Sequence, residues 1–412
     1  MLSFIRANAR WLFGGFLLTF FSSFGQTFFI GLSGEELRAR FALSDGEFGL
    51  LYMAATLGSA ATLPFLGRLL DVVSGRWAIL FVIPPLAIAC VLIAFAPSVA
   101  LLIASIYLLR LFGQGMMTHI AITETGRWFA AGRGRAISLV VPGHQAGEAV
   151  LPIAFVIVST MISWQGAWLI ASAVLIIGAL PAIYALYSRE REPSHTDHAT
   201  GLDRTAQDWT RSEVVKDPYF YALLTGVLAP AFIGTTVFFH QDHLIELRGY
   251  DPLAFASAFP VMALTTVVFS LICGHLVDRF GAIRLLPYFL VPLSVASVAA
   301  SVLTPVWGIY IFMLLLGISY GFTSTLFGAL WPELYGVRYL GGIRAMIVSA
   351  MVFATALGPG LTGYLIDTGI TLPRQLLWMG AWCAGATVML SLVTRPLIHR
   401  TASDQILRVG RT

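Results

Sequence analysis

Charged residues are scarce in this chain. They make up 11% of its 412 residues, whereas a soluble protein carries about 25%. Hydrophobic residues make up 58% of the sequence. A soluble fold of this length has no interior large enough to hide that much apolar surface. The composition therefore excludes a soluble globular protein and indicates a membrane protein that crosses the bilayer several times.

Cysteine is rare as well, and the usual motifs of enzymes are missing. Cys90, Cys273 and Cys383 lie far apart in apolar stretches, which excludes a disulfide framework and a thiolate metal site. No nucleophile elbow, phosphate loop, zinc motif or ATPase motif occurs. We therefore expect no enzyme, no cofactor and no bound metal. The 25 basic residues are spread over loops, which argues against nucleic acid.

Long apolar runs fill most of the chain. Each is about twenty residues long and must be helical, because a lone segment in lipid has to satisfy its own backbone hydrogen bonds. Hydropathy predicts twelve such spans, at 11–32, 48–69, 77–96, 99–122, 136–160, 166–187, 218–241, 253–276, 284–304, 306–330, 342–366 and 374–394. We read the first as an uncleaved span, since it is longer than the apolar part of a signal peptide.

Arginine is distributed unevenly between the two sides of these spans. Most arginines fall in the termini and in the loops on the side of the N-terminus, while the opposite loops hold only Arg38, Arg40, Arg248 and Arg374. Positive charge prefers the inner side of a membrane. Both termini are therefore predicted to be cytoplasmic, in a plasma membrane of bacterial inner-membrane type.

One long polar connection divides the spans into two sets of six. It is rich in Glu, Asp, Arg, Thr and His and has no apolar period, which favours a flexible linker. We predict an N-terminal half at 1–187, a cytoplasmic linker at 188–217, a C-terminal half at 218–394 and a cytoplasmic tail at 395–412. Ser44 and Glu47 form a capping box before the second span, and Asp217-Pro218 and Asp251-Pro252 open later spans.

The two halves repeat a loop motif. Gly67 precedes Asp71 by four residues after the second span, and Gly274 precedes Asp278-Arg279 by the same spacing after the eighth. Repeated halves of this kind are typical of transporters, whose binding site lies between the halves at mid-membrane.

The second copy, Gly274 to Gly281, resembles the signature cytoplasmic loop of the major facilitator superfamily, and Arg110 to Gly115 resembles its fourth-helix motif. The resemblance implies two pseudo-symmetric bundles of six helices that work by alternating access. It also implies gating roles for Gly67, Asp71, Gly274, Asp278 and Arg279, because this loop latches the cytoplasmic side of the outward-open state in that family.

A narrower resemblance concerns the fifth span. Trp128-Phe129 with Arg133 and Ala136, followed by Gly143 and Gly147, is similar to a signature of the monocarboxylate and oxalate/formate porter branches. The acidic residue that those branches carry in the first span and their arginine in the eighth are missing here. A carboxylate substrate would meet Arg110 instead.

Four polar residues are predicted to lie near mid-membrane. Arg110 and Gln114 are four residues apart, as are His144 and Glu148, so each pair shares a helix face. Counting about 1.5 Å per residue puts both Arg110 and Glu148 close to the centre of a layer of about 30 Å. A charge at this depth indicates function unless it is paired.

The chemistry of these groups suggests roles. Arg110 suits a carboxylate, and Glu148 is predicted to pair with it and to take up a proton when substrate displaces it. A static Arg–Glu bridge is the alternative. His144 either relays protons or is a hydrogen-bonded core residue.

Other polar groups are predicted to line the cavity or its mouth. Gln26 and Tyr320 are neutral groups suited to a cavity wall, and His240 and Gln241 lie at the outer end of the seventh span. We interpret the latter as a mouth or gate contact rather than a metal site.

The hypothesis is a monomeric secondary transporter, a symporter that moves a small organic anion such as a monocarboxylate with protons. A proton-driven exporter of drugs or metabolites is the alternative within transport. An intramembrane enzyme or a sensor is the alternative outside it, with His119 beside Thr118 or Thr123 as a poor catalytic pair.

Overall fold

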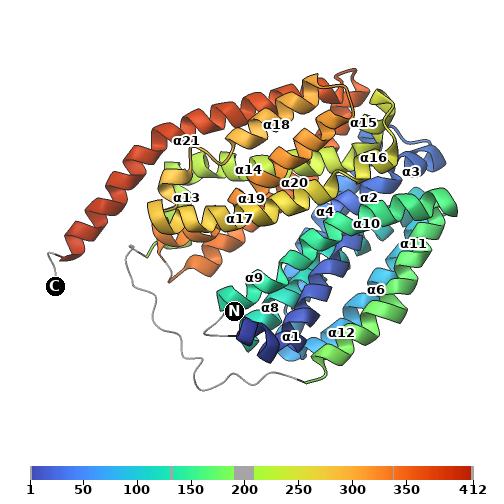
Figure 1. Cartoon of the computed structure of the whole chain (residues 1–412), viewed down its shortest axis with the longest axis horizontal. Helices are drawn as coiled ribbons and strands as arrows, with labels where there is room; N and C mark the ends of the chain where they lie inside the picture. The colour runs from blue at the N-terminus through green and yellow to red at the C-terminus, as the bar shows by residue number, and fades with distance from the viewer. Residues whose placement is uncertain (1, 130–132, 190–207, 337, 410–412) are drawn as a thin grey trace. The chain divides into compact units, whose positions relative to one another are not determined.

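The structure is a computed structural model, and it describes residues 2–129, 133–189, 208–336 and 338–409 (Figure 1). All regular elements within these residues are helices. They are α1 (Leu2–Phe21), η1 (Ser22–Gly25), α2 (Thr27–Ile30), η2 (Gly31–Ser33), α3 (Gly34–Phe41), α4 (Asp45–Leu66), α5 (Leu69–Val72), α6 (Gly75–Phe95), α7 (Val99–Leu108), η3 (Leu109–Met117), α8 (Thr118–Trp128), α9 (Arg133–Val140), α10 (Pro142–Met161), α11 (Trp164–Ala173), η4 (Val174–Ala179), α12 (Leu180–Tyr187), α13 (Arg211–Lys216), α14 (Pro218–Phe239), α15 (Gln241–Arg248), α16 (Pro252–Ala256), α17 (Phe259–Phe280), η5 (Ile283–Leu285), α18 (Val291–Val302), α19 (Trp307–Tyr335), α20 (Leu340–Asp367) and α21 (Leu372–Val409).

Ten helices of the described residues are long and apolar enough to cross a membrane. A bent pair, Phe4–Gly25 with Thr27–Phe41, is an eleventh candidate, and the shorter apolar helix Val291–Val302 lies at the predicted ninth span. The predicted all-α membrane fold is confirmed. Two spans differ in detail from the prediction, because the first is bent by 44° and the ninth begins late.

Local chemistry explains both differences. The first span is interrupted at Gln26, whose backbone is extended, with φ −85° and ψ 155°. The ninth begins only at Val291, after Pro287 and before Pro292. Proline has no N–H to donate to a helix, so it favours a turn or a helix start.

The predicted helix starts are confirmed. Ser44 and Glu47 form the capping box that opens α4. The Asp217 carboxylate accepts a hydrogen bond from Tyr219 N (3.1 Å) at the start of α14, and Asp251 caps α16. Of the predicted linker, residues 190–207 lie outside the described residues. Within its described part, a second capping box at Thr210 starts the short helix α13.

The chain forms two compact units. Unit 1 comprises residues 1–201, 238–259 and 359–364, and unit 2 comprises 202–237, 260–358 and 365–412. The end of α14, the helices α15 and α16, the first residue of α17 and a short piece of α20 thus group with the first six predicted spans. The boundaries of the two predicted halves remain a prediction.

In unit 1, α1 packs against α8, α9, α10 and α12 (Figure 1). Glycines permit the close approach of α10. A Cβ atom on Gly143 would lie 2.2 Å from Phe16 O, and one on Gly147 would lie 2.1 Å from Ser23 Oγ. Small residues let helices in a membrane approach closely, so these two glycines fix the position of α10 beside the first span.

In unit 2, α18 packs against α19 and α21. Gly317 and Gly321 of α19 contact α17, where a Cβ atom would lie 2.0 Å from Thr265 Oγ1 and 2.6 Å from Thr266 O respectively. The glycines on both sides of Tyr320 therefore serve close packing of these two helices.

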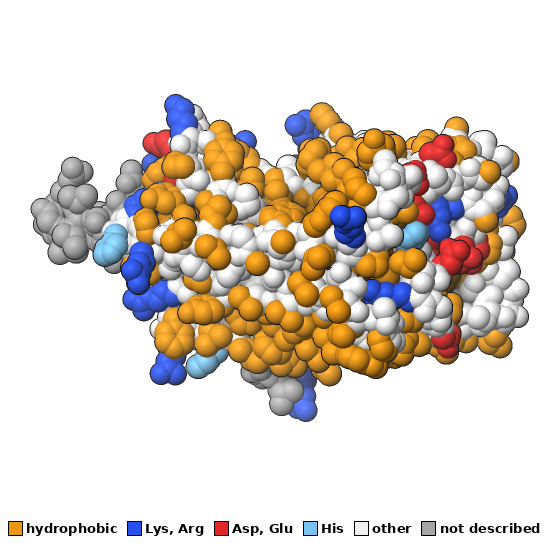
Figure 2. Space-filling view, turned by 90° about the horizontal axis from the view of Figure 1, so that it is seen from above, with side chains coloured by type: hydrophobic (Ala, Val, Ile, Leu, Met, Phe, Trp, Pro, Cys, Tyr) orange, Lys and Arg blue, Asp and Glu red, His pale blue; other side chains and the backbone are white. Residues whose placement is uncertain are grey.

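Large apolar side chains are exposed along the spans. Phe65, Leu271 and Ile177 are each at least 70% exposed, and Figure 2 shows hydrophobic side chains across much of the visible face. Lipid covers such a surface in a protein that spans a membrane.

Candidate functional site

The interruption of the first span organises the candidate site in unit 1. Ser22–Gly25 forms a 3₁₀ turn, Gln26 is extended, and α2 resumes at Thr27. A break of this kind frees backbone groups from the helical ladder. Discontinuous spans form the binding sites of many transporters for this reason.

Arg110 binds to this interruption. Its side chain is buried, and Nη1 lies 3.4 Å from Gly25 O and 3.3 Å from Thr27 Oγ1. The guanidinium lies 5.5 Å from the centre of the Tyr52 ring, and the Tyr52 hydroxyl contacts Thr27 Oγ1 at 2.6 Å. Among the described residues Nε has no hydrogen-bond partner and no carboxylate forms an ion pair with Arg110. In the described part of the chain, the contacts of this cation are therefore with neutral groups.

A close crossing of two glycines brings the backbone of the first span against the helix that carries Arg110. A Cβ atom on Gly25 would lie 2.7 Å from the Cα of Gly113. Gln26 and Gln114 directly follow these glycines, and both are partly buried. The crossing helix is the π-helical segment η3, which also carries Arg110. Such segments are frequent at functional sites.

His144 and Glu148 lie on α10, which also packs against the interrupted part of the first span. The His144 Nε2 atom is 3.4 Å from Glu148 Oε1, one turn apart on α10. Glu148 is buried, and the His144 ring lies 6.3 Å from the ring of Phe28 in α2. Gly143 and Gly147 hold this face of α10 against α1, as described above.

The predicted pair of Arg110 and Glu148 is not formed. Glu148 pairs with His144, while Arg110 contacts Gly25 and Thr27. The break in the first span explains the difference. The interrupted helix offers Arg110 a carbonyl and a hydroxyl as partners. The sequence prediction assumed a regular helix, which does not offer these groups.

His240 belongs to a second cluster in unit 1. Its Nε2 atom contacts Pro359 O at 3.0 Å, and its Nδ1 atom lies 3.7 Å from Asp45. Asp45 also pairs with Arg38 at 3.1 Å and with His243 Nδ1 at 3.2 Å. His240 therefore contacts a charged network rather than the groups around Arg110.

Gln241 and Asp242 extend this network in different directions. Gln241 Nε2 donates to Phe28 O at 2.9 Å, so this amide reaches the interrupted span. Asp242 Oδ2 lies 2.6 Å from Arg38 Nη1. Burial raises the pKa of Asp242, and the hydrogen bond to Asp45 raises the pKa of His243. Within the described part of the chain, no group of three or more His, Cys, Asp or Glu side chains is arranged to hold a metal ion.

Arg38 and Asp45 were not predicted as members of this network. Arg38 was predicted only as a loop charge, and Asp45 lies between the two residues of the predicted capping box. The available signal was an acid and several cations at the same end of neighbouring spans. It does not show which of them meet.

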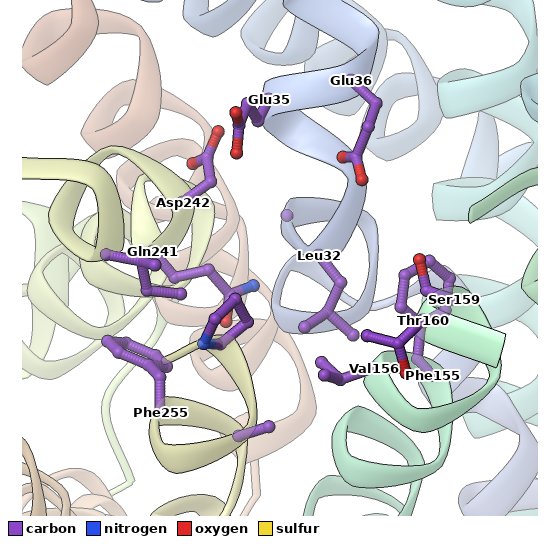
Figure 3. Close-up of a pocket in the computed structure, with 14 residues that line it drawn as sticks. Leu32, Glu35, Glu36, Phe155, Val156, Ser159, Thr160, Gln241, Asp242 and Phe255 are labelled. Carbon is purple, nitrogen blue, oxygen red and sulfur yellow. The ribbon is translucent and has the colours of Figure 1, made fainter. Parts of the chain in front are cut away.

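An acidic pocket of about 180 Å³ lies next to this cluster (Figure 3). Glu35 and Glu36 come from α3, Gln241 and Asp242 from α15, and the wall opposite from α10, with Ser159 among its residues. Gln241 Oε1 and Asp242 Oδ1 are buried acceptors without a partner among the described residues. The pocket thus presents acceptors and negative charge, which repel an anion and suit a cation.

Tyr320 lies in unit 2 and contacts α14. Its hydroxyl is 3.5 Å from Pro230 O, and a Cβ atom on Gly234 would lie 1.7 Å from it. Arg110 and Gln114 lie in unit 1. A shared role of Tyr320 and Arg110 remains a prediction.

The predicted gating residues differ between the two repeats. In the first repeat α4 ends before Gly67, and the Asp71 side chain lies outside the described residues. In the second repeat α17 continues through Gly274 to Phe280, with Asp278 and Arg279 exposed. Here Ala282 N donates to Glu333 Oε2 at 2.9 Å. The gating roles remain a prediction.

The fold and site together define a polytopic membrane transporter built around an interrupted helix. The family model described as Major Facilitator Superfamily matches residues 15–359 and 242–406. The chain belongs to this family. It is therefore a multi-pass membrane transporter rather than an enzyme.

Curated relatives are similar over most of the chain. The "Gentisate transporter" of Corynebacterium glutamicum is 24% identical over 379 residues, which cover 89% of this chain and 83% of that protein. The "Probable sulfoacetate transporter SauU" of Cupriavidus necator is 22% identical over 426 residues, covering 96% and 95%.

Solved structures agree on the fold. A bacterial homologue of the human lysosomal transporter Spinster, inward-facing and occupied, matches with a TM-score of 0.66 and 19% identity over 96% of this chain and 95% of that one. The nucleoside transporter NupG matches with a TM-score of 0.67 and 13% identity over 94% and 99%.

Proposed function

We propose that the protein is a secondary active transporter that moves a small organic anion across the membrane by alternating access. One observation carries the proposal, namely the buried Arg110 guanidinium that no carboxylate of the described residues neutralises. A buried charge without a counter-ion is costly. An anionic substrate that reaches Arg110 at the interrupted span would supply the missing charge, assisted by Gln26 and Gln114.

The named relatives support an anionic substrate. One is named for gentisate and the other for sulfoacetate, and both compounds are organic anions at neutral pH. A monocarboxylate remains our narrower hypothesis, in line with the resemblance of Gly143 and Gly147 to the monocarboxylate branch.

Proton coupling is assigned to His144 and Glu148. The two side chains lie 3.4 Å apart beside the interrupted span, where a proton can be shared between a carboxylate and an imidazole. Substrate binding at Arg110 would change the field at this pair and favour uptake of a proton. We place both termini on the cytoplasmic side of a bacterial inner membrane, on the arginine distribution, and expect a monomer.

Uptake into proteoliposomes tests the proposal. Labelled gentisate, sulfoacetate and a small aliphatic monocarboxylate are offered with an inward proton gradient, and again after a protonophore has collapsed it. We expect accumulation of an acid that depends on the gradient. Failure of all three acids to accumulate would refute anion transport.

Variants of Arg110 locate the site. Arg110→Gln removes the cation and is expected to cost at least about 2 kcal/mol of substrate binding, or about 30-fold in affinity. Arg110→Lys keeps the charge and should retain part of the substrate affinity. The exposed Arg374 is the matched control, and Arg374→Gln should leave uptake unchanged. Equal uptake by Arg110→Gln and Arg374→Gln would show that Arg110 is not part of the substrate site.

Glu148→Gln tests the coupling. The amide keeps the shape but cannot take up a proton, so exchange of labelled for unlabelled substrate should persist while the gradient no longer drives accumulation. Glu246→Gln, at an exposed position of α15, is the control. A wild-type response to pH in Glu148→Gln would make this residue structural.

A second candidate function is a proton-driven exporter of cationic drugs or metabolites. The acidic pocket with the unpartnered acceptors of Gln241 and Asp242 favours it. In this case a lipophilic cation would be transported in exchange for protons, and none of the acids would be transported.

A further inference from the structure

Unit 2 contains an open pocket of about 280 Å³ between α14, α19 and α20. Its lining combines a guanidinium, two aromatic rings and two hydroxyls, from Arg344, Phe327, Trp331, Thr323 and Ser324. All of these residues lie within unit 2. A cavity of about 150 Å³ holds a benzene ring, so this one has room for a substituted ring.

Arg344 supplies the positive charge of the pocket. Its Nη2 atom donates to Gly328 O at 2.8 Å, which orients the guanidinium and leaves most of its five N–H donors for other partners. In the parts of the chain that the structure describes, no carboxylate forms an ion pair with Arg344.

The rings of Phe327 and Trp331 form one wall. They are stacked with centroids 5.6 Å apart and planes at 22°, and Trp331 continues onto Tyr335 at 6.2 Å and 9°. Both pocket rings are more than 90% buried. Their orientation is therefore fixed by packing before any ligand arrives, which lowers the entropic cost of binding a flat molecule.

The two hydroxyls are available as acceptors only. Thr323 Oγ1 donates to Ser319 O at 2.7 Å, and Ser324 Oγ donates to Gly321 O at 3.1 Å. Each hydroxyl has one proton, and here it is given to the helix. The lone pairs remain free to accept from a ligand that carries its own O–H groups.

We propose that this pocket binds an aromatic hydroxycarboxylate, with its carboxylate on Arg344, its ring against Phe327 and Trp331, and a ring hydroxyl donating to Ser324 or Thr323. The inference rests on the proposed anion transport and narrows its substrate class. The acidic pocket of unit 1 is unsuited to the same ligand, because Glu35, Glu36 and Asp242 repel a carboxylate.

The pocket lies at the end of α20 that adjoins the linker. Arg344 is one turn from the start of α20, and the preceding loop is held by Arg338 N, which donates to Asp208 Oδ1 at 3.1 Å. If the linker is cytoplasmic as proposed, the substrate meets this pocket on the cytoplasmic side of its path.

Equilibrium binding to the full-length protein in detergent tests the inference, with gentisate, benzoate and sulfoacetate as probes. Arg344→Gln should weaken gentisate and benzoate about tenfold or more, because a charge-assisted hydrogen-bond partner is lost. Trp331→Leu should weaken both aromatic acids about three- to tenfold and leave sulfoacetate unchanged. Ser324→Ala should reduce the preference for gentisate over benzoate several-fold.

Two further variants complete the binding experiment. Arg338→Gln, an exposed arginine in the adjoining loop, is the matched control and should bind all probes as the wild type does. Arg344→Lys keeps the charge and replaces Arg344→Gln in the test if that variant does not fold. We expect a partial loss of gentisate binding, because lysine lacks the planar fork of arginine.

Several outcomes overturn the inference. If the wild type and both Arg344 variants bind gentisate equally, the inference is wrong. The proposed anion transport is unaffected by this result as long as uptake persists. An effect of Arg344→Gln that appears only in vesicles with anionic lipid would also overturn the inference, since Arg344 would then bind lipid phosphate. Failure of every acid to enter liposomes tests the proposed function instead, because binding in detergent is measured independently.

Discussion

Replacing Gly25 by alanine probes the crossing that holds the candidate site together. A Cβ atom at this position would lie 2.1 Å from Leu109 O and 2.7 Å from Gly113 Cα. Carbon–oxygen contacts normally begin near ~3.3 Å, so the new methyl is about 1.2 Å too close to a backbone carbonyl. Because the obstructing atoms belong to a helix backbone, no side-chain rotation relieves the overlap.

The cost follows from this geometry. Overpacking a filled interior costs about 1–3 kcal/mol, and an obstacle made of helix backbone favours the upper end, about 3 kcal/mol. The first span and η3 have to separate, which moves Arg110 away from Gly25 O and Thr27. Substrate affinity should therefore fall together with the free energy of unfolding.

Thermal unfolding of the purified protein and binding of its acid substrate measure the two effects. The control is Gly178→Ala, because a Cβ atom there meets nothing within 4 Å and alanine should be neutral or stabilise by about 0.4–1 kcal/mol. A Gly25→Ala protein that melts and binds like the wild type would refute the close crossing.

Two more predictions concern the ends of the spans. The pKa of His243 is raised from 6.5 by its bond to Asp45, so the stabilisation is fully present below about pH 6.5 and is lost as the pH rises through the raised value. The protection of the α15 amides, measured against their intrinsic exchange rate at each pH, should therefore fall at alkaline pH in the wild type but not in His243→Gln, with the exposed His275→Gln as the control. An identical pH response in all three proteins would contradict it. Ser44→Ala removes the cap that accepts from Glu47 N at 3.0 Å and should lower the free energy of unfolding by about 1 kcal/mol; an unchanged melting temperature would mean that the start of α4 needs no side-chain cap.

The sequence by itself determined the class of protein and most of its helices. Apolar runs of about twenty residues have only one solution in lipid, and the confirmed caps at Ser44, Asp217 and Asp251 are local signals that need no tertiary contact. That His144 and Glu148 share one face of α10 followed from their spacing alone.

The tertiary structure decided which of these groups meet. The break at Gln26 gave Arg110 neutral partners in place of Glu148, and the glycine contacts of Gly25 and Gly113 set the crossing. Hydropathy averages over a span and does not register one extended residue. It also does not show that Arg344, Phe327 and Trp331 share a pocket, because they come from two helices whose facing sides are fixed only by packing.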